Sequence, residues 1–121
     1  GASPAAHGAM SVANIVLAPT ALRTAELDAT EELVNEIADY PLVLVPNFVP
    51  TTPPAPEIER LRRIIAGTPV QVAPPIPTAL HVGTRKKRMA ITAETPPAKS
   101  LQKVADALGN LSDFVKGYVN A

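Results

Sequence analysis

The sequence predicts an α/β fold, with α+β as the alternative. Two observations carry this prediction: segments with apolar residues at helical spacing alternate with short apolar runs, and proline or glycine separates most of them. The expected order is β-α-β-α-β-β-β-α, which gives a small mixed sheet of four to five strands with three helices. Strands separated by helices favour parallel pairing through right-handed crossovers, and the late pair of strands adds an antiparallel hairpin.

The central unit of the predicted fold is a helix that leads into a buried strand. Residues 28–40 place Leu33, Val34 and Ile37 on one face, which is helical spacing. Residues 42–45 form an apolar run with no polar position, as expected for a strand that is covered on both faces. This unit anchors the expected helix and strand order on both sides.

The segment before this unit predicts a first strand and the start of the helix. Residues 12–18 form a short apolar run that ends at Pro19. Thr20 follows as a candidate N-cap for a helical stretch that merges with the helix at 28–40. A first strand followed by a helix is therefore expected here.

The segment after the central strand predicts a connector, a second helix and a third strand. Residues 50–56 contain four prolines and are expected to form a stiff extended connector. Residues 57–66 carry apolar residues on one helical face, and Gly67 is a natural C-terminal stop. Residues 68–73 alternate apolar and polar side chains, which predicts a strand.

The last third of the chain predicts a hairpin and a long helix. Residues 79–82 and 89–94 are the expected strands of the hairpin, and residues 83–88 form its turn. Residues 97–119 carry the strongest amphipathic pattern in the chain, with apolar residues three and four apart. The candidate apolar interface on this helix consists of Leu101, Leu108, Val115 and Val119.

Length and composition predict one domain with an aliphatic core. Residues 1–10 are expected to be a cloning remnant or a disordered leader, and residues 11–121 a single domain. Aromatic residues make up only 3% of the 121 residues, so valine, leucine, isoleucine and alanine must fill the core. No apolar run reaches the length of about 18 residues typical of a membrane span, and a cytoplasmic or virion-associated protein is expected.

The sequence contains no recognisable catalytic, metal or cofactor motif. It has no cysteine, which excludes disulfides and thiolate ligands. His7 and His81 are the two histidines, and two distant histidines do not make a zinc site. Because glycine-rich phosphate loops and nucleophile elbows are also missing, we expect no cofactor and no enzymatic activity.

Charge is balanced overall but segregated along the chain. Lysine plus arginine and aspartate plus glutamate both number 11, which argues against a dedicated nucleic-acid binder. The acidic segment on the central helix includes Glu31, Glu32 and Glu36. The basic run at the expected hairpin tip consists of Arg85, Lys86, Lys87 and Arg88. Three interpretations remain open for this run: contact with nucleic-acid phosphates, docking on the acidic helix of a second copy, and a solvated strand end without a partner.

These observations favour a non-catalytic protein-binding and assembly module that associates with itself as a homo-oligomer. A structural or accessory component of a larger bacterial or phage assembly would have these properties. The alternative function is nucleic-acid binding through the basic run at 85–88. A second alternative is an enzyme with an unrecognised site.

Overall fold

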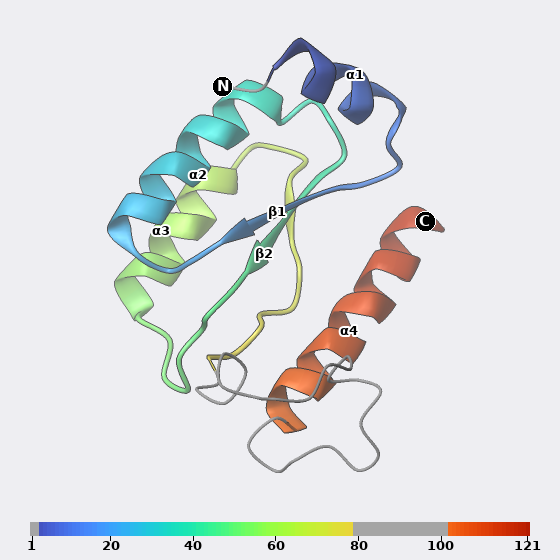
Figure 1. The fold of residues 1–121 in the computed structure, drawn as a ribbon. Helices are drawn as coiled ribbons and strands as arrows, with labels where there is room; N and C mark the ends of the chain where they lie inside the picture. Colours follow the sequence, from blue (N-terminus) through green and yellow to red (C-terminus); the bar gives the residue numbers. More distant parts are fainter. Residues whose placement is uncertain (1–2, 79–101) are drawn as a thin grey trace.

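The computed structural model describes residues 3–78 and 102–121, which form four helices and a three-stranded parallel sheet. The strands are β1 (Val16–Thr20), β2 (Leu42–Pro46) and β3 (Gln71–Val72), and they lie side by side in that order. Figure 1 shows β1 and β2 crossing the middle of the molecule, with helices on either side. The α/β class predicted from the sequence is confirmed.

The register of β1 fixes which of its backbone groups face β2. Val16 pairs with Leu42, and the pairing continues through to Thr20. The N–H of Val16 donates to the carbonyl of Pro41 at 2.8 Å, and the N–H of Asn47 donates to the carbonyl of Thr20 at 2.7 Å. Because hydrogen-bonding groups alternate sides along a strand, the first, third and fifth residues of β1 point inward, toward β2.

Pro19 is tolerated within β1 because it occupies one of the outward positions. A proline has no N–H, so it is compatible with a strand only where that N–H would make no ladder bond. The β1 edge, defined here as the outer side of β1 with the outward groups of Ile15, Leu17 and Pro19, satisfies that condition. Within residues 3–78 and 102–121, no strand pairs with the β1 edge.

Proline also limits β3, which has only two residues in regular pairing. Val43 pairs with Gln71 and Leu44 with Val72. The next position on β2 whose N–H would face β3 is Pro46, which has none to donate. The neighbouring chain nevertheless stays alongside, since Val49 forms an isolated parallel bridge farther on, with Pro77.

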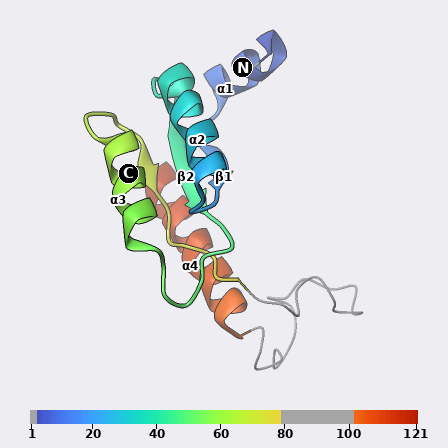
Figure 2. The ribbon, with the colours of Figure 1, turned by 90° about the vertical axis from the view of Figure 1, so that its left-hand side faces the viewer.

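Helices α2 (Thr24–Ile37) and α3 (Ala55–Ile65) cover one face of the sheet (Figure 2). They pack on each other and on the side chains of β1 and β2 that point to this face of the sheet. The largest fully buried residues of this layer are Leu27, Val34, Leu42 and Leu44. Arg60 of α3 donates to the carboxylate of Asp28 and to the carbonyl oxygen of Thr24, so it joins the exposed sides of the two helices.

Helix α4 (Gln102–Val119) lies against the opposite face of the sheet. Val43, Val45 and Ala73 form a buried cluster there, and the helix packs Leu111 and Phe114, together with Tyr118, against it. Only Val104 and Ala107 are buried among the described residues of α4. The helix continues without a break through Gly109 and Asn110.

Helix α1 (Pro4–Val12) precedes the sheet. Its N-cap is Ser3, whose side chain accepts a hydrogen bond from the N–H of Ala6, and the proline in the first turn needs no such partner. The helix is tied to the domain through His7, whose Nδ1 lies 3.1 Å from the hydroxyl of Tyr40.

Three parts of the predicted architecture are wrong in detail. The chain has four helices in its described part and not three, because the segment of α1 is helical. The described residues form three parallel strands, not the mixed sheet of four to five; the strands expected at 79–82 and 89–94 lie outside the described residues. The first strand was also placed too early, since it begins at Val16 and extends through Pro19 to Thr20.

The helices of the described residues are too short or too polar to cross a membrane. This finding agrees with the absence of long apolar runs in the sequence.

Candidate functional site

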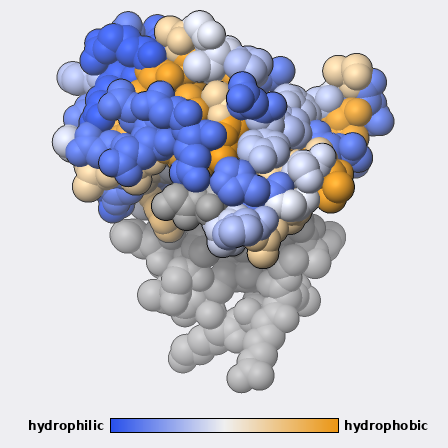
Figure 3. Space-filling model, turned by 90° about the horizontal axis from the view of Figure 1, so that it is seen from above, coloured by the Kyte–Doolittle hydropathy of each residue, from blue (hydrophilic) through white to orange (hydrophobic). Residues whose placement is uncertain are grey.

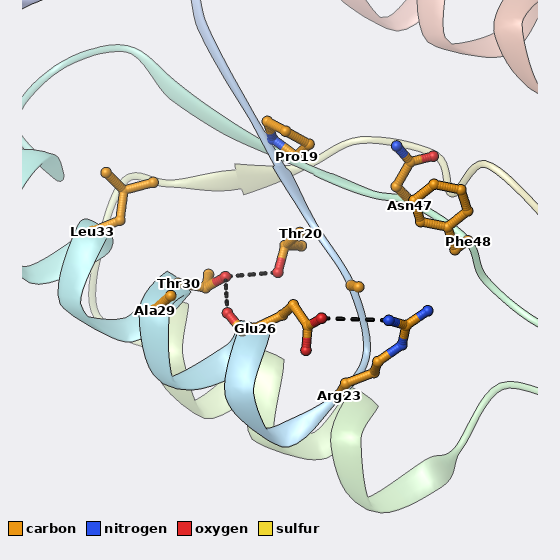
Figure 4. A pocket seen from close by; sticks show the side chains of 10 residues that line it. Pro19, Thr20, Arg23, Glu26, Ala29, Thr30, Leu33, Asn47 and Phe48 are labelled. Atoms are coloured by element: carbon orange, nitrogen blue, oxygen red, sulfur yellow. Dashed lines mark hydrogen bonds and ion pairs between the residues drawn. The ribbon is translucent and has the colours of Figure 1, made fainter.

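A pocket opens where β1 and β2 end, at the edge formed by their carboxyl ends. We call it the carboxyl-end pocket. In open α/β sheets, this edge is where ligands commonly bind, because the loops that leave the strands diverge there. The pocket has a volume of about 330 Å³, and its side chains come from the end of β1, the first half of α2 and the loop after β2 (Figure 4). The residues that carry its chemistry are Thr20, Arg23, Glu26, Thr30, Asn47 and Phe48.

The inner wall of the pocket contains two hydrogen bonds in series. The hydroxyl of Thr30 donates to the carbonyl oxygen of Glu26 at 2.8 Å. The hydroxyl of Thr20 lies 2.6 Å from that of Thr30, and since the latter's proton is already engaged, Thr20 is the donor. Both threonines are buried, so the pair links β1 to α2 without leaving a polar group unsatisfied.

The outer wall of the pocket carries opposite charges that neutralise each other. Arg23 lies one residue before α2, and its Nη1 is 3.4 Å from Oε1 of Glu26. The Arg23 side chain is largely exposed and that of Glu26 is partly exposed, and such an ion pair contributes little to stability. The guanidinium group, the Glu26 carboxylate and the amide of Asn47 are hydrogen-bonding groups in the lining of the pocket.

Phe48 stands at the rim of the pocket in an unusual backbone conformation. Its φ is 52°, in the left-handed region, and its side chain is 61% exposed. A bulky residue in this region is strained, because Cβ approaches the backbone carbonyl oxygen too closely. The strain is imposed by the chain, which must leave β2 and turn into the proline-rich connector.

The pocket has the hollow shape of a ligand site, and several of its polar groups are engaged with one another. Its buried hydroxyls bond to each other, and its charged groups are exposed. In the part of the chain that the structure describes, no cluster of three or more histidine, aspartate or glutamate side chains is positioned to hold a metal ion. The pocket therefore offers hydrogen bonds and an exposed aromatic ring to a ligand.

A second feature lies on the sheet itself, on the face that carries α4. The helix covers β2, where Val43 is 0% and Val45 is 6% exposed. It does not cover β1, where Leu17 is 44% exposed although its side chain points to the same face. Parallel sheets occur almost only with both faces covered, so an uncovered strand in such a sheet is unusual. We call this area the uncovered sheet face.

The end of α4 adds further exposed apolar surface on this side of the molecule. Val119 is 41% exposed, and Leu108 and Val115 are partly exposed. Seen from above, hydrophilic side chains dominate the side of α2 and α3, with hydrophobic side chains between them, and hydrophobic side chains also reach the surface on the opposite side (Figure 3). Three of the four residues of the candidate apolar interface are thus only partly covered, and Leu101 lies outside the described residues.

Of the two predicted charged segments, the structure describes the acidic one. Glu31 and Glu32 are exposed on α2. Glu36 lies one turn farther on, with Oε1 3.6 Å from Nε2 of His7. The expected basic partners, Arg85, Lys86, Lys87 and Arg88, lie outside the described residues, as does His81.

Sequence reasoning missed both structural features. The carboxyl-end pocket depends on Thr20 and Asn47, each of which ends or follows a strand, and the position of polar residues after apolar runs was the available signal. The exposure of Leu17 carried no signal at all, because an apolar residue in an apolar run is expected to be buried.

Comparison with known proteins found no match among protein-family models, curated proteins or solved structures.

Proposed function

We propose that the protein is a non-catalytic assembly module that associates with itself through the uncovered sheet face. The observation that carries this proposal is the contrast between β1 and β2 on one face of one sheet. Val43 of β2 is fully buried, whereas Leu17 of β1 is 44% exposed. A second copy of the chain would supply the cover that α4 does not provide.

The exposed apolar area of Leu17 and Val119 favours association. Burial of apolar surface contributes about 25 cal/mol per Å², and a fully buried leucine contributes roughly 1.5–3 kcal/mol relative to an exposed one. Leu17 and Val119 both retain a large part of their surface in solvent. In an interface between copies, this apolar surface would be removed from water. Self-association is the simplest way to bury it, because each copy carries the same surface.

The proposal extends to the setting of the protein. An assembly module of this size, without an enzymatic site, would serve as a structural or accessory component of a larger bacterial or phage assembly, in the cytoplasm or on the virion. The alternative is nucleic-acid binding by the basic run at 85–88, which the balanced net charge disfavours. The second alternative is an enzyme with an unrecognised site; in the carboxyl-end pocket, Thr20 bonds to Thr30 and Arg23 pairs with Glu26.

Sedimentation over a concentration series tests the proposal with a matched pair of variants. Leu17→Gln places a polar side chain on the uncovered sheet face and should shift the protein to monomer. Val12→Gln is the control, because Val12 is 82% exposed at the end of α1 and lies outside the sheet. Equal association of the two variants would contradict the proposal, as would a wild-type protein that stays monomeric at every concentration.

A further inference from the structure

We infer that two copies join edge to edge through β1, antiparallel and centred on Leu17, so that the two sheets become one continuous sheet of six strands. This inference rests on the proposed function, and it names the partner as a second copy and the contact as the β1 edge. The uncovered sheet face indicates that β1 has exposed apolar surface to bury. The backbone groups of β1 indicate how the second copy would bind.

Within the described residues, the β1 edge has unpaired backbone groups. The inward N–H and C=O groups of β1 bond to β2, as the bonds of Val16 and Thr20 show. By alternation, Leu17 directs both its N–H and its C=O outward, and Pro19 directs only a C=O outward. Within the described residues, no hydrogen bond is made by these outward groups.

Apart from Pro19, β1 carries no feature that protects this edge. Natural edge strands usually carry charged side chains, bulges or well-placed prolines that discourage pairing with another chain. Residues 15–20 contain no charged side chain. Pro19 removes one donor, but it lies near the end of the strand and leaves Leu17 free to pair.

The donors and acceptors of the β1 edge are complementary to those of the same edge in a second copy. A two-fold axis relates identical surfaces, and it makes the two β1 strands antiparallel. With the axis at Leu17, that residue faces its own copy and the two exchange a pair of N–H to C=O bonds. Ile15 then faces Pro19 of the second copy, where the N–H of the first meets the lone outward C=O of the second. The partial charges of donors and acceptors are therefore complementary, and the missing N–H of Pro19 is the only gap on each side.

This pairing would also cover the exposed side chain of Leu17. An axis perpendicular to the sheet keeps equivalent side chains on one face, so Leu17 and its copy lie next to each other there. Directly opposite residues in an antiparallel pair have Cβ atoms about 4.5–5.5 Å apart, which is contact distance for leucine. The two α4 helices would flank this pair on the same face, and the backbone and apolar parts of the interface would form together.

Cysteine cross-linking tests the register directly, because the chain has no cysteine of its own. Under mild oxidation, Leu17→Cys should give a covalent dimer at about twice the 12.7 kDa of the chain. Ile15→Cys and Pro19→Cys should not cross-link alone, since each residue would lie about 14 Å from its own copy at about 3.4 Å per residue. An equimolar mixture of these two variants should cross-link, because the pairing places Ile15 opposite Pro19. Val12→Cys measures the background from random collision.

The outcomes separate the inference from the proposed function. If the wild-type protein is an oligomer but Leu17→Cys cross-links no faster than Val12→Cys, the edge pairing is wrong and self-association stands. Cross-linking of Ile15→Cys or Pro19→Cys alone would place the axis elsewhere and also overturn the inference. A wild-type protein that is monomeric at every concentration would overturn both. Circular dichroism of each variant establishes that the fold is retained before oxidation.

Discussion

The hydroxyl groups of Thr20 and Thr30 lie 2.6 Å apart, in a buried contact that joins the end of β1 to α2. This contact positions the first strand against the first crossover helix. It also forms the inner wall of the carboxyl-end pocket. A buried pair of polar side chains is stabilising only while both partners are present, which makes its removal informative.

The two threonines should respond unequally to replacement by valine, which has the same shape. Thr30→Val leaves the hydroxyl of Thr20 without an acceptor, and we expect a loss of about 1–3 kcal/mol in the free energy of unfolding. Thr20→Val leaves Thr30 bonded to the carbonyl of Glu26, so the loss should be about 0.5–1.5 kcal/mol. Urea denaturation measures both, and the double variant should be less destabilised than the sum of the two. A larger loss for Thr20→Val would reverse the assigned donor.

Replacement of Phe48 by asparagine should stabilise the protein. The φ of 52° costs a bulky residue about 1–2 kcal/mol, whereas asparagine tolerates this conformation through its short polar side chain. Because the ring is largely exposed, little packing is lost. We expect a small rise in Tm for Phe48→Asn. A fall in Tm would mean that the ring makes contacts that outweigh its strain. Val12→Asn, at an exposed helical site, is the control for the change in side chain alone.

Burial separates the roles of two leucines that lie on adjacent strands. Leu44 of β2 is fully buried, and Leu44→Ala should lower the free energy of unfolding by about 2–5 kcal/mol through lost burial and a residual cavity. Leu17→Ala should change the stability of the isolated chain by no more than about 0.5 kcal/mol, because its side chain is partly in solvent. Chemical denaturation at low protein concentration measures both values without a contribution from association. Similar losses for the two variants would show that Leu17 belongs to the core.

Much of the fold could be predicted from the spacing of apolar residues and from the positions of proline and glycine. The apolar run at 42–45 became β2, and Gly67, with a φ of 75°, ends the turn after α3 as its type suggested. The amphipathic pattern of the last helix also gave α4. These elements depend mainly on local sequence and on burial, which a single pattern can reveal.

The rest of the fold depends on contacts between distant residues. The sequence predicts that a strand ends at Pro19, yet this residue is acceptable within β1 because its backbone nitrogen faces away from β2. Only the sheet register reveals that direction. Ser3 and Pro4 had the sequence of a helix start, but the weakly amphipathic segment after them gave no apolar stripe to support α1.

The candidate site depends on topology to a still greater degree. Thr20 and Thr30 become partners because a crossover returns α2 over β1. The exposure of Leu17 follows from where α4 lies across the sheet. Neither relationship follows from the sequence alone, because each depends on how elements far apart in the chain are placed.

The segregated charges provide a separate prediction about partners. We expect the variant with Arg85, Lys86, Lys87 and Arg88 changed to alanine to keep the wild-type oligomeric mass, because the uncovered sheet face is apolar. We also expect neither protein to bind DNA or RNA oligonucleotides in fluorescence anisotropy titrations. Binding by the wild type that this variant loses, with no change in mass, would establish the nucleic-acid alternative.

Reversal of the acidic segment completes this comparison. If the basic run docks on α2 of a second copy, replacing Glu31, Glu32 and Glu36 by lysine should dissociate the oligomer, as should the alanine variant of the basic run. An unchanged mass in both variants would exclude charge pairing between copies. The apolar interface predicts this second result.

The most direct test of self-association is the solution mass of the wild-type protein, measured by light scattering after size exclusion at low and at high salt. Salt screens exposed charges over about 10 Å at 0.1 M and about 3 Å at 1 M but leaves apolar contacts intact. Association through the uncovered sheet face predicts a discrete oligomer with the same mass at both salt concentrations. A monomer under both conditions, or an oligomer that dissociates as salt is raised, would contradict it.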